Sequence, residues 1–166
     1  MGPSKERGGG RNPPAKLLRM YRHSLATLMV IGGQTDDRRA VALAFHRAGP
    51  LRRGPFVFTD CGRDESRLRE AFQACLTSAE TGPNLVLAAW GGTLHLDSIA
   101  ALSSESQRLL LCLLDRTRGE HDAWPLRLGV GGREDLVEAV NAGRFLPALY
   151  DGLDKIRVEL DRLVAA

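Results

Sequence analysis

The stretch that decides the fold is Thr27-Leu-Met-Val-Ile31, an uninterrupted apolar run that leads into Gly32-Gly33. A short apolar run bounded by glycines is typical of a strand that is buried on both faces of a parallel sheet and then enters a turn. Residues 36–48 follow with apolar side chains at helical spacing, and this pattern stops at Gly49-Pro50. The region therefore predicts a strand, a turn and a helix in succession.

The same alternation continues through the rest of the chain. Further strands are expected at 55–59, 93–97, 126–130 and 155–160. Helices are expected at 65–77, 103–118 and 134–142, and a short helical piece at 15–24. Strands that alternate with helices within one domain favour a parallel sheet with helices on both faces. The expected fold class is therefore α/β, a three-layer sandwich around a mostly parallel five-stranded sheet.

Composition limits the class of protein. A chain of 166 residues with 43% hydrophobic and 26% charged residues is typical of one soluble globular domain. No apolar stretch approaches the roughly 20 residues of a membrane helix, and no secretory signal follows the basic N-terminus. Cys61, Cys75 and Cys112 are isolated, which argues against a disulfide framework or a zinc site. We expect a cytoplasmic protein without a metal or a membrane partner.

The net charge of +3 is unevenly distributed. Residues 1–22 have six basic side chains against Glu6 alone, a net charge of +5, so the remainder carries −2. Residues 1–14 contain three consecutive glycines and almost no apolar side chain, a composition typical of disorder. We therefore divide the chain into a disordered basic tail at 1–22 and an α/β domain at 23–166. Nucleic acid contact is unlikely for the domain and is expected, if at all, through this tail.

Four segments, in this order and spacing, resemble a known family: Ala42–Arg47 (ALAFHR), Gly54–Phe56 (GPF), Gly91–Asp97 (GGTLHLD) and Ala142–Tyr150 (AGRFLPALY). The family is the AAA+ domain of sigma-54-dependent transcription activators, called the sigma-54 interaction domain. The resemblance covers about residues 28–163. It implies a P-loop NTPase core and, in a complete member, ATP hydrolysis.

The segment that matches the family's phosphate loop is Gly32–Arg39. Such a loop needs glycines, whose backbone N–H groups surround a phosphate, and a lysine that reaches it. Here Arg38 stands at the lysine position, and its guanidinium lacks the compact shape of an ammonium. Asp36 and Asp37 place two carboxylates where a polyanion would bind. We predict that this loop does not hold a nucleotide.

Other family positions are also altered. Asp97 matches the family's magnesium-binding aspartate, but Ser98 replaces the glutamate that orients the attacking water. We expect Asp97 to cap the following helix or to accept from nearby N–H groups. Gly131-Gly132-Arg133 stand where the family reads approximately Ala-Thr-Asn. Leu146 and Gly152 occupy the positions of the two arginine fingers that the resemblance implies.

Two features that the resemblance implies for partners are expected to be missing. Residues 73–90 contain nothing like the GAFTGA loop that touches sigma-54, and the helical lid over the nucleotide is not expected. His46 and His95 are expected to have packing or surface roles. Trp90 and Trp124 are open to two interpretations, as anchors for a partner protein or as covers for the ends of the sheet.

The sequence thus predicts a non-enzymatic AAA+-like domain without a cofactor. We expect it to bind a protein partner, of unknown identity, in bacterial transcription or signalling control. One alternative is residual nucleotide binding through the remnant positions Gly32, Gly33, Arg38, Arg39 and Asp97. A second alternative is nucleic acid contact through the basic tail. The oligomeric state stays open.

Overall fold

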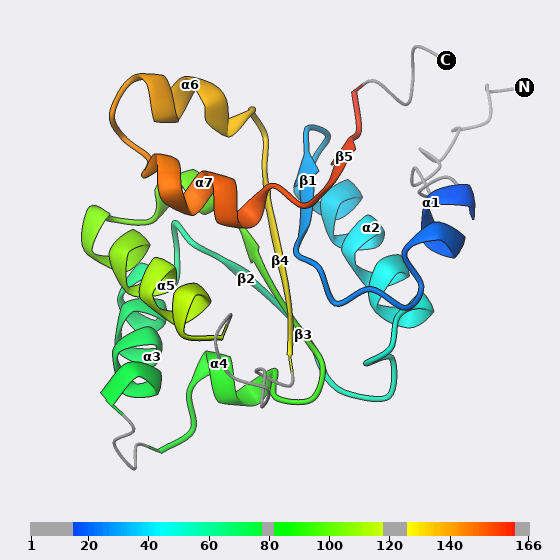
Figure 1. Ribbon diagram of the computed structural model, residues 1–166, viewed down its shortest axis with the longest axis horizontal. Coiled ribbons are helices and arrows are strands. Elements are labelled where there is room, and N and C mark those ends of the chain that lie inside the picture. Colours follow the sequence, from blue (N-terminus) through cyan, green and yellow to red (C-terminus); the bar gives the residue numbers. More distant parts are fainter. Residues whose placement is uncertain (1–14, 78–81, 118–125, 162–166) are drawn as a thin grey trace, which may run out of the picture.

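The computed structural model describes residues 15–77, 82–117 and 126–161. Five strands form one sheet with the order β2-β3-β4-β1-β5, and every pairing is parallel (Figure 1). The strands are β1 (Leu28–Ile31), β2 (Phe56–Asp60), β3 (Thr93–Asp97), β4 (Arg127–Gly132) and β5 (Ile156–Glu159). The predicted five-stranded sheet is confirmed, and it is wholly parallel.

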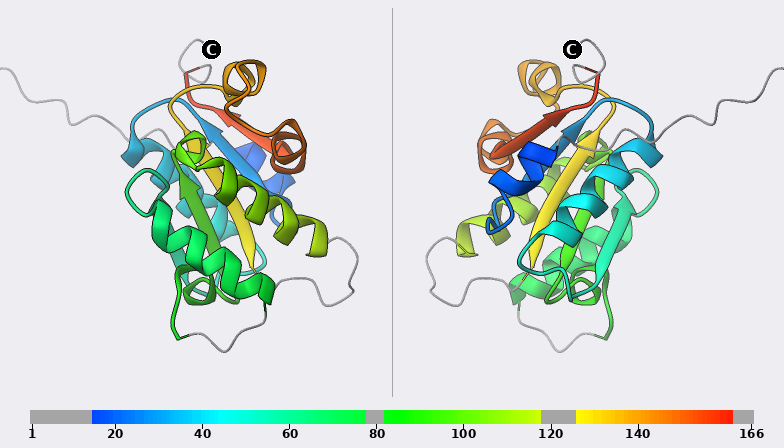
Figure 2. Two further views of the ribbon diagram at one scale, coloured as in Figure 1. Left: turned by 90° about the vertical axis from the view of Figure 1, so that its left-hand side faces the viewer. Right: turned by 90° about the vertical axis from the view of Figure 1, so that its right-hand side faces the viewer.

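Helices cover both faces of the sheet, as Figure 2 shows. On one face lie α1 (Ala15–Met20) and α2 (Thr35–Ala48). On the other lie α3 (Glu65–Thr77), α5 (Ser104–Thr117) and α7 (Pro147–Leu153). The shorter elements are α4 (Leu85–Ala88), a 3-10 turn η1 (Ile99–Ala101) and α6 (Leu136–Asn141). The three-layer α/β architecture is therefore confirmed.

Several element boundaries differ from those expected. Helix α4 was not predicted because a single turn has no measurable periodicity. Helix α7 was not predicted either, although Pro147 at its first position is a recognised start signal. Helix α1 ends at Met20 rather than at 24, and its Leu17 and Leu18 pack on the domain. The boundary of the tail at residue 22 stays a prediction, and residues 1–14 and Trp124 lie outside the described part of the chain.

The two faces of the sheet differ in polarity. Between the sheet and α3, α5 and α7 lies a large apolar core that includes Phe72, Leu94 and Phe145. Beneath α2 a smaller apolar cluster covers only β1 and β5. On that same face the neighbouring strands bury polar or side-chain-free positions, which are Thr93, His95 and Asp97 on β3 and Arg127, Gly129 and Gly131 on β4. Helix α2 therefore packs on a surface that is apolar on one side and polar on the other.

In the segments that the structure describes, no helix has both the length and the apolar character needed to span a membrane.

Candidate functional site

The candidate site lies at the carboxyl ends of β1 and β3, where the resemblance places the nucleotide. Only Gly32–Gln34 form a loop there, because α2 already begins at Thr35. Gly32 and Gly33 have φ values of 90° and 62°, a left-handed conformation that favours glycine. The segment that matches the phosphate loop is thus a three-residue loop followed by the start of α2.

Two carboxylates already use backbone N–H groups of this loop. Asp37 Oδ2 accepts from the Gln34 N–H at 2.8 Å, and Asp161 Oδ1 accepts from the Gly33 N–H at 3.4 Å. These are donors of the kind that a phosphate would need. Two of the three N–H groups of the loop therefore point at the protein's own carboxylates, and the third, that of Gly32, donates to the Gly132 carbonyl oxygen.

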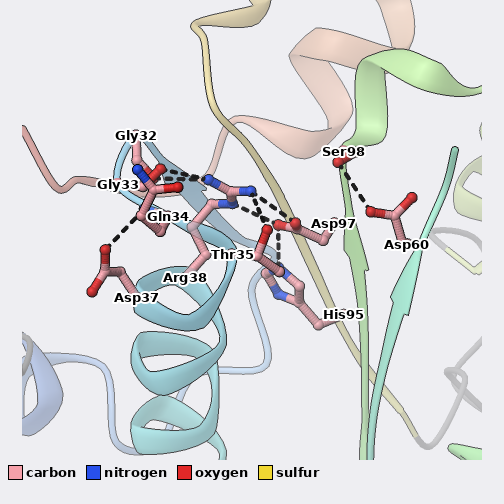
Figure 3. Close-up of polar contacts among 10 residues, drawn as sticks. All are labelled: Gly32, Gly33, Gln34, Thr35, Asp37, Arg38, Asp60, His95, Asp97 and Ser98. Atoms are coloured by element: carbon pink, nitrogen blue, oxygen red, sulfur yellow. Dashed lines mark hydrogen bonds and ion pairs between the residues drawn. The ribbon is translucent and has the colours of Figure 1, made fainter. Parts of the chain in front are cut away.

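Arg38 lies across the space between the loop and β3 (Figure 3). Its Nε and Nη2 donate to the two carboxylate oxygens of Asp97 at 2.8 and 2.9 Å. Its Nη1 donates to the carbonyl oxygens of Gly33 and Gly32 at 2.9 and 3.1 Å. Arg38 is 4% exposed and Asp97 is fully buried. The guanidinium thus holds together the loop after β1 and the end of β3.

This contact decides between the two roles expected for Asp97. The carboxylate does not cap the following turn, but it accepts from nearby N–H groups, which are those of the Arg38 guanidinium. Its partner is the guanidinium of Arg38, because a carboxylate that is fully buried needs a compensating charge. The 3-10 turn that follows β3 begins at Ser98 without a side-chain cap.

His95 extends the buried cluster on the opposite side of Asp97. Its Nε2 lies 3.7 Å from Asp97 Oδ1, which is too far for a hydrogen bond. The imidazole stacks on Phe58 with a centroid distance of 4.9 Å and an interplanar angle of 3°. Neither ring nitrogen has a hydrogen-bond partner within the described segments. The imidazole is therefore held by packing.

Two glycines of β4 make room for this imidazole. A Cβ atom on Gly129 would lie 2.7 Å from His95 Nδ1. One on Gly131 would lie 2.9 Å from Asp97 Oδ1 and 3.0 Å from His95 Nε2. This role of the two glycines is not among those that we predict from the sequence. The available signal was glycine at alternate positions of an otherwise apolar strand, which indicates close approach from one face.

The environment sets the charges of the cluster. Burial alone raises the pKa of Asp97, but the adjacent His95 and the Arg38 guanidinium outweigh it and lower that pKa below its ordinary value. Burial lowers the pKa of His95, despite the opposing effect of Asp97. At neutral pH Asp97 is therefore a carboxylate and His95 a neutral imidazole.

Helix α2 runs along strand β3, and the rise of four residues in the helix is close to the rise of two residues in the strand. Four helical residues rise about 6 Å and two strand residues about 6.6 Å. Arg38 therefore meets Asp97 while His46, eight residues later, meets Thr93, with His46 Nδ1 and Thr93 Oγ1 2.8 Å apart. His46 Nε2 also lies 3.1 Å from the Gly54 carbonyl oxygen. His46 thus has the packing role that we expected.

Comparison with known proteins identifies the family. The family model described as "Sigma-54 interaction domain" matches residues 13–159. The chain belongs to the sigma-54 interaction domain family. It is 31% identical to the response regulator PilR of Pseudomonas aeruginosa and 32% identical to the regulator NtrC of Rhizobium meliloti, over 93% and 82% of this chain. It spans only 38% and 31% of the lengths of those relatives.

Solved structures agree with this fold. NtrX from Brucella abortus in complex with ATP matches 88% of this sigma-54 interaction domain and 35% of its own chain, with a TM-score of 0.72 and 20% identity. The P-loop NTPase domain of a sigma-54 activator from Escherichia coli matches 87% of this chain and 89% of its own, with a TM-score of 0.65 and 20% identity. These structures support the fold, and the family match over residues 13–159 confirms the resemblance inferred from the sequence.

The remaining predicted residues of this sigma-54 interaction domain are dispersed. Arg39, a remnant position for nucleotide binding by the sequence, is exposed, and its guanidinium lies 5.3 Å from the centre of the Phe58 ring. Ser98 has a left-handed φ of 55° and donates to Asp60 at 3.4 Å. Trp90 is 46% exposed. Of the five remnant positions, the structure therefore brings together Gly32, Gly33, Arg38 and Asp97, but not Arg39.

A pocket of about 390 Å³ lies beside the cluster, between η1 and the start of α6. Its lining includes Arg133, Leu136 and Arg144, and none of Gly32–Arg38 contributes to it. Within the described ranges, no group of three or more His, Cys, Asp or Glu side chains is placed to hold a metal ion.

Proposed function

We propose that this chain is a sigma-54 interaction domain that acts in transcription regulation by binding a protein, without turnover of ATP. The observation that supports the proposal is the buried, two-pronged ion pair between Arg38 and Asp97. In a working site these two positions would contact the phosphates and the magnesium ion. In this chain the side chains of Arg38 and Asp97 bind each other instead.

Entry of a magnesium nucleotide would require this pair to separate. Breaking a buried ion pair costs about 3–5 kcal/mol when one partner loses its counter-charge. The incoming phosphates would also meet the carboxylates of Asp36, Asp37 and Asp161 near the loop. This opposing field leaves little free energy for nucleotide binding.

The regulatory part of the proposal follows from the relatives. Their names describe response regulators and transcriptional regulators, among them a sigma-54-dependent activator of Pseudomonas putida that is 31% identical to this chain. Because the chain covers 38%, 43% and 31% of the lengths of these relatives, we do not assign it the activity of the whole relatives. We propose that this domain acts in the bacterial cytoplasm on a protein of the same regulatory system.

Isothermal titration with ATP and magnesium tests the proposal. We expect no saturable heat at millimolar ATP, no rise in melting temperature and no phosphate release. NtrX from Brucella abortus, whose solved structure contains ATP, is the positive control. The variant Asp36→Gly/Asp37→Gly/Arg38→Lys asks whether restoring the loop chemistry restores binding.

Two other outcomes of these ATP measurements would change the conclusion. Phosphate release by the unaltered chain would overturn the proposal. Saturable ATP binding without phosphate release would favour residual nucleotide binding instead.

A further inference from the structure

Strand β2 is an edge strand whose outer side has no partner among the described residues. It pairs only with β3, and the Pro55 carbonyl and the Cys61 N–H make the hydrogen bonds at the two ends of that pairing. Because backbone groups alternate in direction along a strand, the N–H and C=O groups of Phe56 and Phe58 point away from the sheet. The outer side of β2 lies free of other described elements in Figure 2.

The opposite edge of the sheet differs in chemistry. On β5, Ile156 and Leu160 donate towards β1, so Arg157 and Glu159 hold the outward backbone positions. Arg157 also forms ion pairs with Asp154 and Asp135. Charged residues at an edge discourage the addition of another strand. On β2 two half-buried phenylalanines hold the first two outward positions. The third is Asp60, whose backbone carbonyl already accepts from the Asp64 N–H, so the free outward positions of this edge are uncharged.

The surroundings of the β2 edge are basic. Arg39 lies over Phe58, and Arg52 and Arg53 are exposed just before the strand. None of these three arginines forms an ion pair within the segments that the structure describes. The acidic residue of the strand, Asp60, directs Oδ1 at the N–H groups of Gly62 and Arg63. A ligand at this edge therefore meets free cations and a carboxylate that is already engaged.

We propose that the edge of β2 binds an extended acidic segment of a partner protein as an added strand. The outward N–H and C=O groups of Phe56 and Phe58 supply the main-chain hydrogen bonds. Arg39, Arg52 and Arg53 select for carboxylates and against basic segments. This inference deepens the proposed function, on which it rests, by naming its docking surface and the chemistry of its partner.

A peptide of defined sequence tests the inference. The probe is a seven-residue peptide of alternating glutamate and valine, blocked at both ends, titrated into the full chain and followed by amide NMR. We expect shifts and slower hydrogen exchange at the amides of Phe56 and Phe58. The same peptide with lysine for glutamate, or with N-methylated alternate amides, leaves those amides unchanged.

Charge variants supply the matched comparison. Arg39→Glu/Arg53→Glu weakens binding of the acidic peptide about tenfold. Arg108→Glu, an exposed change on α5, leaves binding unchanged.

Three results would overturn the inference: no shift at β2, equal binding of both peptides, or peptide-independent pairing of two copies through this edge. The ATP titration separates the two proposals. If the peptide does not bind at β2, the result of the ATP titration is unaffected. Saturable ATP binding, in turn, would count against the proposed function and not against peptide binding at β2.

Discussion

The guanidinium of Arg38 is planar and presents several donors at once, so it reaches both oxygens of Asp97 and two backbone carbonyls together. An ammonium is a point charge without this paired geometry. At the scale of the residue, the change from lysine to arginine keeps the charge and alters what that charge binds. In this chain the charge of Arg38 binds Asp97 and the loop after β1, within the same domain.

Removing one side of the pair tests its role. We expect Arg38→Met to lower the free energy of unfolding by about 3–5 kcal/mol, because Asp97 is left buried without a counter-charge. Arg38→Met/Asp97→Leu is expected to recover most of that loss, since apolar replacements of a buried pair are often tolerated. Urea denaturation at pH 7 measures both. The exposed change Arg39→Met is the control, and a double variant no more stable than Arg38→Met would contradict the prediction.

Among the elements, β3 and β4 pack closely because a large side chain on β3, that of His95, lies opposite a glycine on β4. His95 occupies the space above Gly129, and the register pairs these two residues directly. Interiors are packed closely enough that an added methyl group cannot be absorbed without movement of its neighbours.

We therefore expect Gly129→Ala to destabilise the domain by about 1–3 kcal/mol. His95→Ala removes the clashing ring, so the same glycine substitution should cost much less in that background, which a double-mutant cycle measures. Gly132→Ala is the matched control, because a Cβ atom there meets only an ordinary contact at 3.8 Å. Equal costs of Gly129→Ala with and without His95 would disprove the coupling.

At the scale of the whole molecule, titratable groups from several elements make stability depend on pH. Burial lowers the pKa values of His46 and His95, so the folded state resists their protonation. The pKa of Asp64 is lowered by the hydrogen bond from Thr59, and that of Asp97 is also lowered. The stability that the histidines contribute is present above their unfolded pKa of about 6.5 and is lost as pH falls below it. The carboxylate contribution is present above a pH of about 4 and is lost below it.

The free energy of unfolding is therefore expected to decrease steadily on acidification from pH 7. Denaturation at a series of pH values measures this dependence. His95→Phe removes one of the two buried imidazoles, so the loss between pH 7 and pH 5 should become smaller. An unchanged slope in this variant would show that His95 does not contribute.

Local patterns in the sequence were sufficient to predict the parallel α/β class, the positions of the five strands and the family. Apolar runs, helical spacing and glycine turns are local properties, and the run at 27–31 shows them plainly. The replacement of lysine by Arg38 was equally visible in the sequence.

The contacts of Arg38, by contrast, depend on the packing of distant elements. Arg38 and Asp97 are 59 positions apart and meet because β1 and β3 lie on either side of β4 in one sheet. The pairing of His95 with Gly129 depends on the register of β3 and β4, and the open edge of β2 depends on the strand order. Local periodicity sets the direction in which a side chain points along its own element. It carries no information about which distant element lies opposite, because strand order and register are set by packing of the whole chain.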